Sequence, residues 1–243
     1  MFTGFPEETF QFFLDIRFHN DSLYFNEHRE RYQQDVQRVF YDFIDALAPA
    51  MLKIDHAMEV RPAKCLARLR RDTRFTKDKT PYRDHLWITF RPGGEGREGN
   101  AMFWFELGLE SMSWGMGIWG DNRPVTDRMR RQIAAKPRVL QNILDGLRQC
   151  PSEFRLEGSI LKKIAVPETV PDELINWYRA KELYVSRQGI AHRWCRSKAL
   201  VDRVRKDYMA LSPLYQYLRG IYRDEMEIMS TPTNRQSTPE RSL

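Results

Sequence analysis

The chain has 243 residues and 29.0 kDa, the size of one large domain, and its 42% hydrophobic residues exclude a wholly disordered protein. Three widely spaced cysteines exclude a disulfide framework and a cysteine-based zinc site, and they indicate a reducing compartment. The N-terminus has no signal-peptide pattern, and no uncharged apolar run is long enough to span a bilayer. We therefore expect a soluble, cytoplasmic protein that has no membrane partner.

The first 50 residues have the apolar spacing of amphipathic helices. One helix is predicted over 6–17, and a longer one begins at Leu23 and is expected to end or bend near Pro49. The segment 19–22 between them contains helix breakers and N-capping residues.

Apolar and polar residues then alternate in four consecutive strand-like segments, 65–70, 86–90, 102–109 and 112–118. This alternation is typical of an antiparallel sheet with one buried face. The glycine-rich segment 92–96 predicts a loop, and Glu110-Ser111 predicts a tight hairpin between the last two segments.

The C-terminal half returns to helices. Asp121 or Asn122 can cap a helical region that Pro137 divides into two helices. The segment 154–164 can return one or two strands to the sheet, and 183–186 is extended again. Further helices are predicted to begin at Asp172, Ser197 and Ser212-Pro213.

Together these patterns predict an α+β fold, an antiparallel sheet of about four to six strands flanked by helices. We expect a single domain over 1–230. The polar segment 231–243 contains no core residues and predicts a mobile tail. The oligomeric state is not readable from the sequence.

Positive charge is concentrated in one stretch, residues 61–83. Nine basic and two acidic residues give it a net charge of +7, whereas the whole chain carries +6. The rest of the chain is therefore close to neutral. A duplex-binding protein usually spreads positive charge along a whole face, so this concentration favours a local site.

Within this stretch the predicted strand gives way to a turn after Asp72. The residues expected to converge at this strand end are Arg68, Arg71, Asp72, Arg74, Lys79 and Tyr82. Guanidinium groups bind carboxylate or phosphate bidentately, so the cluster predicts a site for a small anionic ligand. Asp72 would orient an arginine, or act as a base if crowding raised its pKa, although the neighbouring cations favour its carboxylate form. Phe75 is expected to anchor the loop in the core.

Two other interpretations of the cluster stay open. The same residues can form a closed structural clamp that ties a loop to the sheet. They can also bind single-stranded nucleic acid, with Trp87 and Trp104 as stacking faces beside the arginines. His85 follows the cluster closely and can join it as an acid or base, or it can be a half-buried residue at a strand start. Whether a ligand would only bind or would also react is not decided by the sequence.

The stretch RLRRDTRFTKDKTPYR resembles the signature Arg-x-x-Arg-Asp-x-Arg-Phe-x-x-Asp-Lys-x-x-Tyr of a bacterial family, domain of unknown function 2461. The positions that match are Arg68, Arg71, Asp72, Arg74, Phe75, Asp78, Lys79 and Tyr82. The resemblance extends from the N-terminal FTGFPEETFQFFLDI to about Arg187. It departs at Asp21 and Tyr24, where the family usually has Asn and Trp. The resemblance implies no activity, because none is assigned to the family.

Other motifs give no support for a metal or cofactor. Gly115-x-Gly117-x-x-Gly120 has the letters of a dinucleotide fingerprint, but the next helix cannot begin before Asp121–Pro124. We expect these glycines to lie on a strand face against a helix. The five histidines form no metal-binding pair, and the chain has no Walker loop or nucleophile elbow.

Overall fold

The computed structural model describes residues 1–187 and 192–230, apart from the side chain of His192. The segment 231–243, for which the sequence predicts a mobile tail, lies outside these residues.

A five-stranded antiparallel sheet with the strand order β1-β2-β3-β5-β4 forms the centre of the fold. Its strands are β1 (His85–Phe90), β2 (Ala101–Gly108), β3 (Met112–Ile118), β4 (Arg155–Ile160) and β5 (Ala180–Arg187). The predicted α+β class is therefore confirmed. The three strands predicted over 86–118 are present, and the ambiguous segment 154–164 supplies the edge strand β4.

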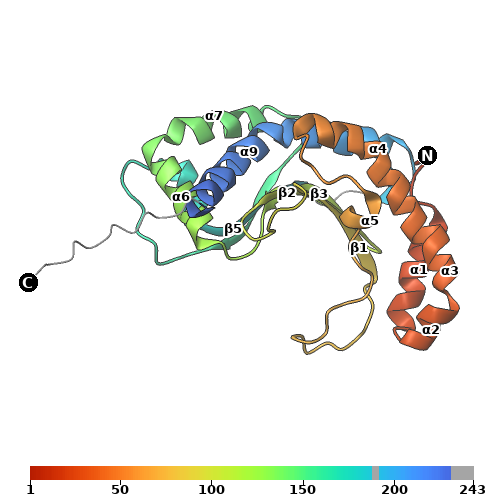
Figure 1. The fold of residues 1–243 in the computed structure, drawn as a ribbon. Coiled ribbons are helices and arrows are strands. Elements are labelled where there is room, and N and C mark those ends of the chain that lie inside the picture. The colour runs from red at the N-terminus through yellow and green to blue at the C-terminus, as the bar shows by residue number, and fades with distance from the viewer. Residues whose placement is uncertain (188–191, 231–243) are drawn as a thin grey trace, which may run out of the picture.

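Helices cover one face of this sheet and leave the opposite face uncovered (Figure 1). The helical elements are α1 (Glu7–Phe18), α2 (Ser22–Glu27), α3 (Arg29–Arg31), the π-helical turn η1 (Tyr32–Gln37), α4 (Arg38–Ile54), α5 (Pro62–Cys65), α6 (Arg123–Ala135), α7 (Pro137–Arg148), η2 (Asp172–Leu174), α8 (Ile175–Arg179), η3 (His192–Trp194) and α9 (Ala199–Ser230). Helix α9 packs on β2 and β3, and α4, α6 and α7 pack on α9. Within the described residues, no helix combines the length and the apolar character needed to cross a membrane.

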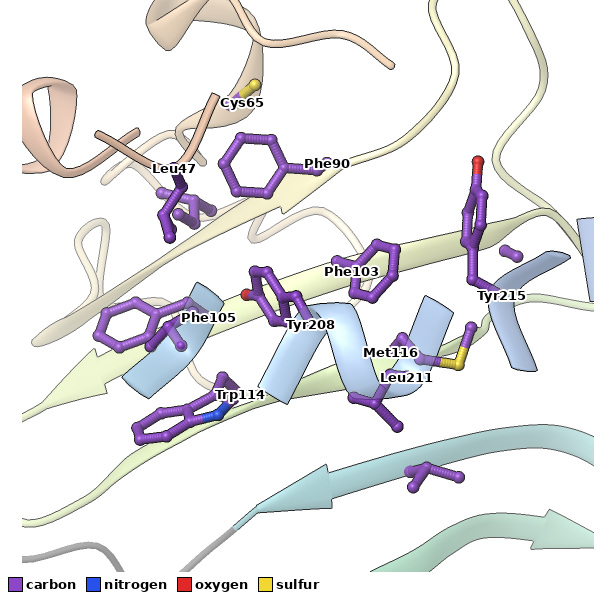
Figure 2. Close-up of a cluster of buried hydrophobic side chains, with 14 of the residues drawn as sticks. Leu47, Cys65, Phe90, Phe103, Phe105, Trp114, Met116, Tyr208, Leu211 and Tyr215 are labelled. Carbon is purple, nitrogen blue, oxygen red and sulfur yellow. The ribbon is translucent and has the colours of Figure 1, made fainter. Parts of the chain in front are cut away.

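A central part of the core lies between β2, β3 and α9 (Figure 2). Period-two alternation puts Phe103, Phe105 and Trp114 on the helix side of the sheet, where all are fully buried. The Phe103 ring lies 4.9 Å from the Tyr208 ring and 5.1 Å from the Tyr215 ring. Burial of each such large side chain contributes about 1.5–3 kcal/mol.

The hairpin between β2 and β3 is tight, as predicted, but its loop is Leu109-Glu110 rather than Glu110-Ser111. The amide of Gly108 donates to the carbonyl of Ser111 over 2.9 Å and closes the turn. A two-residue loop of this kind sets the register of the two strands.

The helix predicted to end or bend near Pro49 continues to Ile54, and the helix predicted to begin at Ser212-Pro213 is part of a longer one. Pro49 lies inside α4 and Pro213 lies inside α9, and both rings are on the exposed side. An internal proline costs about 3 kcal/mol. The turns beyond Pro49 bury Met51 and Ile54, which together stabilise by about 3–6 kcal/mol and outweigh this cost.

The segment 65–70 is not a strand of the sheet, which is a second correction. Helix α5 ends at Cys65, and the chain then runs beside β1 through an isolated bridge between Leu66 and Ile88. Cys65 and Leu69 are buried, so the alternation correctly predicted that one side of this segment faces the core. After Leu69 the chain turns away from the sheet into solvent, so this segment forms no continuous ladder of backbone hydrogen bonds with β1.

The glycines of β3 face aromatic rings on the uncovered face, not a helix as predicted. A Cβ atom added to Gly115 would lie 2.5 Å from the Trp104 ring, and one added to Gly117 would lie 2.8 Å from Cβ of Tyr184. Only glycine leaves room for these side chains to lie across β3. The strand position of both glycines confirms that the fingerprint letters form no nucleotide-binding turn.

Candidate functional site

The charged stretch forms a long loop at the β1 edge of the sheet. Its stem is held by backbone hydrogen bonds from Arg71 to Pro81 (2.8 Å) and from Arg83 to Leu69 (3.0 Å), and an isolated bridge joins Arg70 to Tyr82. The gold loop in Figure 1 descends from this edge beyond the uncovered face. The loop thus stands next to the side of the sheet that carries no helices.

Two ion pairs stabilise the loop from within. The guanidinium group of Arg74 binds Asp72 bidentately, with Nε–Oδ1 and Nη2–Oδ2 distances of 2.9 and 2.7 Å. Arg71 donates to Asp78 and to the hydroxyl of Thr80. The predicted convergence of all these cations on Asp72 does not occur, because each carboxylate takes one arginine.

The pKa values of both carboxyl groups are low. Hydrogen bonds from the side chain and backbone of Arg74 lower the pKa of Asp72 to about 2. The backbone amide of Thr80, followed by the side chain of Arg71, lowers the pKa of Asp78 to about 2. Asp72 is therefore a carboxylate at neutral pH. It orients Arg74 and is not suited to act as a base.

The aromatic anchor of the loop is Tyr82, and the prediction for Phe75 is wrong. Phe75 is 88% exposed at the far end of the loop. Tyr82 is 5% exposed, and its ring stacks on Phe25 at 4.5 Å. The side chain of Asn20 holds the Tyr82 backbone through two hydrogen bonds of 2.9 Å. Tyr82 therefore supports the loop at its base.

Lys79 also makes its contact within the loop. Its ammonium group donates to the carbonyl of Thr73 over 2.8 Å. Of the predicted site residues, Arg68, Arg71, Asp72 and Arg74 line one groove, whereas Lys79 and Tyr82 do not.

This feature, which we call the basic groove, has a volume of about 780 Å³ and lies between the loop, α5 and β1. Eight cationic side chains line it, Lys64, Arg68, Arg70, Arg71, Arg74, Arg83, Arg91 and Arg97. Asp72 is the one carboxylate among those lining residues that the structure describes. Such an excess of fixed positive charge in a concave surface attracts anions.

Several groove residues still have free hydrogen-bond donors. The side chains of Arg68 and Arg97 make no hydrogen bond or ion pair with any other residue that the structure describes. Arg91 uses Nη1 for the carbonyl of Glu95, at 2.9 Å. The groove is therefore an open site with available guanidinium groups, although part of the cluster is engaged in the loop.

Arg83 is a further residue of the groove whose role the sequence did not indicate. Its Nη1 donates to the carbonyls of Arg68 and Arg70, at 2.8 and 2.9 Å, and its guanidinium carbon lies 4.8 Å from the centre of the Trp87 ring. Burial, followed by the charge of Arg71, lowers its pKa. Arg83 thus joins the loop stem to the aromatic surface of the sheet.

Arg91 and Arg97 lie outside the +7 stretch, and sequence reasoning missed both. Arg91 continues the outward series of Trp87 and Thr89 with period two, a signal that would have placed it on the uncovered face. Arg97 lies in the loop between β1 and β2, where no pattern marks it.

A second concavity, the aromatic hollow, lies on the uncovered face and has a volume of about 480 Å³. Its floor consists of Trp87, Met102, Trp104, Trp119 and Gly120, and its rim of His85, Thr89, Arg97, Glu98 and Glu106. Trp104 is only 8% exposed, so the prediction that it offers an open stacking face is wrong.

His85 stands between two carboxylates at this rim. Its Nδ1 lies 3.1 Å from Asp84, and its Nε2 lies 3.8 Å from Glu106. Asp84 is itself held by Arg17 over 2.6 Å. Such an arrangement orients the imidazole ring at the rim of the hollow.

Metal binding has no comparable support. In 1–187 and 192–230, no group of three or more His, Cys, Asp or Glu side chains is placed to hold a metal ion.

Comparison with known proteins identifies the family. The model of a family described as "Conserved hypothetical protein (DUF2461)" matches residues 8–217. This range contains the charged loop, the basic groove and the aromatic hollow. No curated protein matches the chain.

Proposed function

The chain belongs to the conserved hypothetical family DUF2461, and we propose that it binds a small anionic ligand with phosphate or carboxylate groups in the basic groove. The observation that carries this proposal is the lining of the groove, eight cationic side chains against one carboxylate. Guanidinium groups hold such anions through paired hydrogen bonds. The scattered cysteines lead us to expect that binding takes place in the cytoplasm.

The residues divide between two roles in this proposal. Arg68 and Arg97 contact the ligand, because their side chains engage no other described residue. Arg71 and Arg74 add positive charge and keep the loop in shape through Asp78 and Asp72. Lys79 and Tyr82 stabilise the loop without touching the ligand.

The alternative of a closed structural clamp is less well supported. The Arg74–Asp72 and Arg71–Asp78 pairs join residues of the same loop, so they do not tie the loop to the sheet. Exposed ion pairs of this kind contribute little to stability. A clamp would also leave the side chains of Arg68 and Arg97 without a role.

The test is thermal unfolding in the presence of inorganic tripolyphosphate. An anion at 100 times its dissociation constant stabilises the folded state by about 2.7 kcal/mol, which raises Tm by roughly 5–10 °C. Replacing both free arginines, Arg68→Ala with Arg97→Ala, is expected to abolish the rise.

The matched control is Arg38→Ala with Arg123→Ala. These arginines lie on α4 and α6, and their side chains are also largely exposed. The control changes the net charge equally and should keep the full rise in Tm. An equal rise in the groove variant and in the control would refute the proposal.

A further inference from the structure

We propose that the anionic ligand is a nucleotide, whose phosphate groups lie in the basic groove while its planar base lies in the aromatic hollow. This inference rests on the proposed function, since it needs the groove to hold the phosphates. It adds to the proposed function a second binding surface, the aromatic hollow, and the chemical class of the ligand.

The two concavities adjoin each other. Trp87, Thr89 and Arg97 line both the basic groove and the aromatic hollow. A single molecule can therefore reach from one to the other across these three side chains. The hollow, at about 480 Å³, has the size of an ordinary small-molecule site.

The floor of the hollow is suited to a flat ring. Tyr184 stacks on Trp119 with the ring centres 4.7 Å apart, and Trp104 stands perpendicular to Trp119 at 5.2 Å. Tyr184 does not line the hollow. Trp119 itself lines the hollow, and its contacts with Tyr184 and Trp104 hold its ring in place. A base stacked beside it would gain the favourable interaction of aromatic surfaces.

The charges of the two concavities differ, and this difference sets the orientation of the ligand. The rim of the hollow has two carboxylates, Glu98 and Glu106, whereas the groove has only Asp72 among its cations. Phosphate groups are repelled from the carboxylates and attracted to the arginines. The amino and ring N–H groups of a base are donors, and carboxylates accept from them. A nucleotide presents these two chemistries at its two ends.

The same chemistry is available from a free nucleotide and from a nucleotide of a single strand. The test therefore compares three kinds of ligand by isothermal titration calorimetry. These are inorganic tripolyphosphate, the four ribonucleoside triphosphates added one at a time, and an eight-residue single-stranded RNA. We expect at least one triphosphate nucleotide or the RNA to bind more tightly than tripolyphosphate.

The decisive variant is Trp119→Leu. Loss of a stacking platform is expected to weaken binding of the tightest nucleotide ligand by about 5- to 150-fold and to leave tripolyphosphate binding unchanged. The matched control is Trp194→Leu, since Trp194 is also half-buried but does not line the hollow. The control should bind every ligand as the parent protein does.

A second variant, Glu106→Ala, tests the rim without disturbing the aromatic floor. It should change the order of preference among the four nucleotides. If tripolyphosphate binds but no nucleotide ligand binds more tightly, or if neither variant affects nucleotide binding, the inference is wrong and the proposed function stands. If no anion binds at all, both are wrong. Tighter binding of the RNA than of any triphosphate identifies a single strand as the source of the nucleotide.

Discussion

Asp72 and Asp78 lie in the same loop, yet different donors hold their carboxylates. Both pKa values, at about 2, lie below those of an unfolded chain. These interactions therefore stabilise the folded loop fully when the pH is above the ordinary carboxyl pKa of about 4. The stabilisation is lost as the pH falls towards about 2.

Arg74→Ala should raise the pKa of Asp72 towards its ordinary value, because the variant removes both side-chain hydrogen bonds to it. The pKa of Asp78 should not change, since Thr80 and Arg71 remain. Carbon-13 NMR titration of the aspartate carboxyl groups measures both values in one sample. An Asp72 midpoint that stays at about 2 in the variant would contradict the ion pair.

For single residues, the sequence predicted where the positive charge gathers better than it predicted which side chains contact each other. The basic residues of 68–74 do gather at one groove. The choice of Tyr82 over Phe75 as anchor was not predictable, because it depends on Asn20, 62 residues earlier in the chain. Both aromatic side chains flank the same polar loop, so local pattern alone does not distinguish them.

Among the elements, the strands with strict alternation and the division of α6 from α7 at Pro137 were predicted well, whereas the helix boundaries predicted at Pro49 and Pro213 were not. In β1–β3 each core-facing residue is apolar over the whole strand, and this signal is local. The continuation of α4 and α9 past proline depends on what the following turn buries, which only the tertiary structure determines.

Pro213→Ala should therefore stabilise the protein, by about 1–3 kcal/mol, because α9 regains a backbone hydrogen bond and the replaced ring is exposed. Urea denaturation followed by circular dichroism measures the change. Pro124→Ala is the control, since Pro124 lies in the first turn of α6, where proline breaks no helical hydrogen bond. If Pro124→Ala raised the free energy of unfolding as much as Pro213→Ala, the position of Pro213 inside a helix would not be the cause of the stabilisation.

At the scale of the whole molecule, one buried carboxylate connects several elements. Asp207 on α9 is 1% exposed and accepts from the Trp114 indole of β3 over 2.8 Å and from Arg187 of β5 over 3.1 Å. It also accepts from Ser152, which precedes β4. Asp207 therefore joins the main helix to three parts of the sheet layer.

Asp207→Ala should lower the free energy of unfolding by about 3–5 kcal/mol, because it leaves a largely buried arginine and an indole N–H without their acceptor. Chemical denaturation measures this change. Asp202→Ala on the same helix is the control, since Asp202 forms an exposed pair with Arg205 and should cost less than about 0.5 kcal/mol. Similar values for the two variants would rule out this role of Asp207.

The helices lie on a single side of the sheet, and this has a consequence for how the protein can change over generations. Along β1, every second side chain helps to hold the fold together, and those between, such as Trp87 and Thr89, line the concavities. Under the proposed function, a substitution at these intervening positions would alter which ligands bind and would leave the packing behind the strand intact. Descendants of one ancestral scaffold can therefore diverge in ligand preference at a small cost in stability.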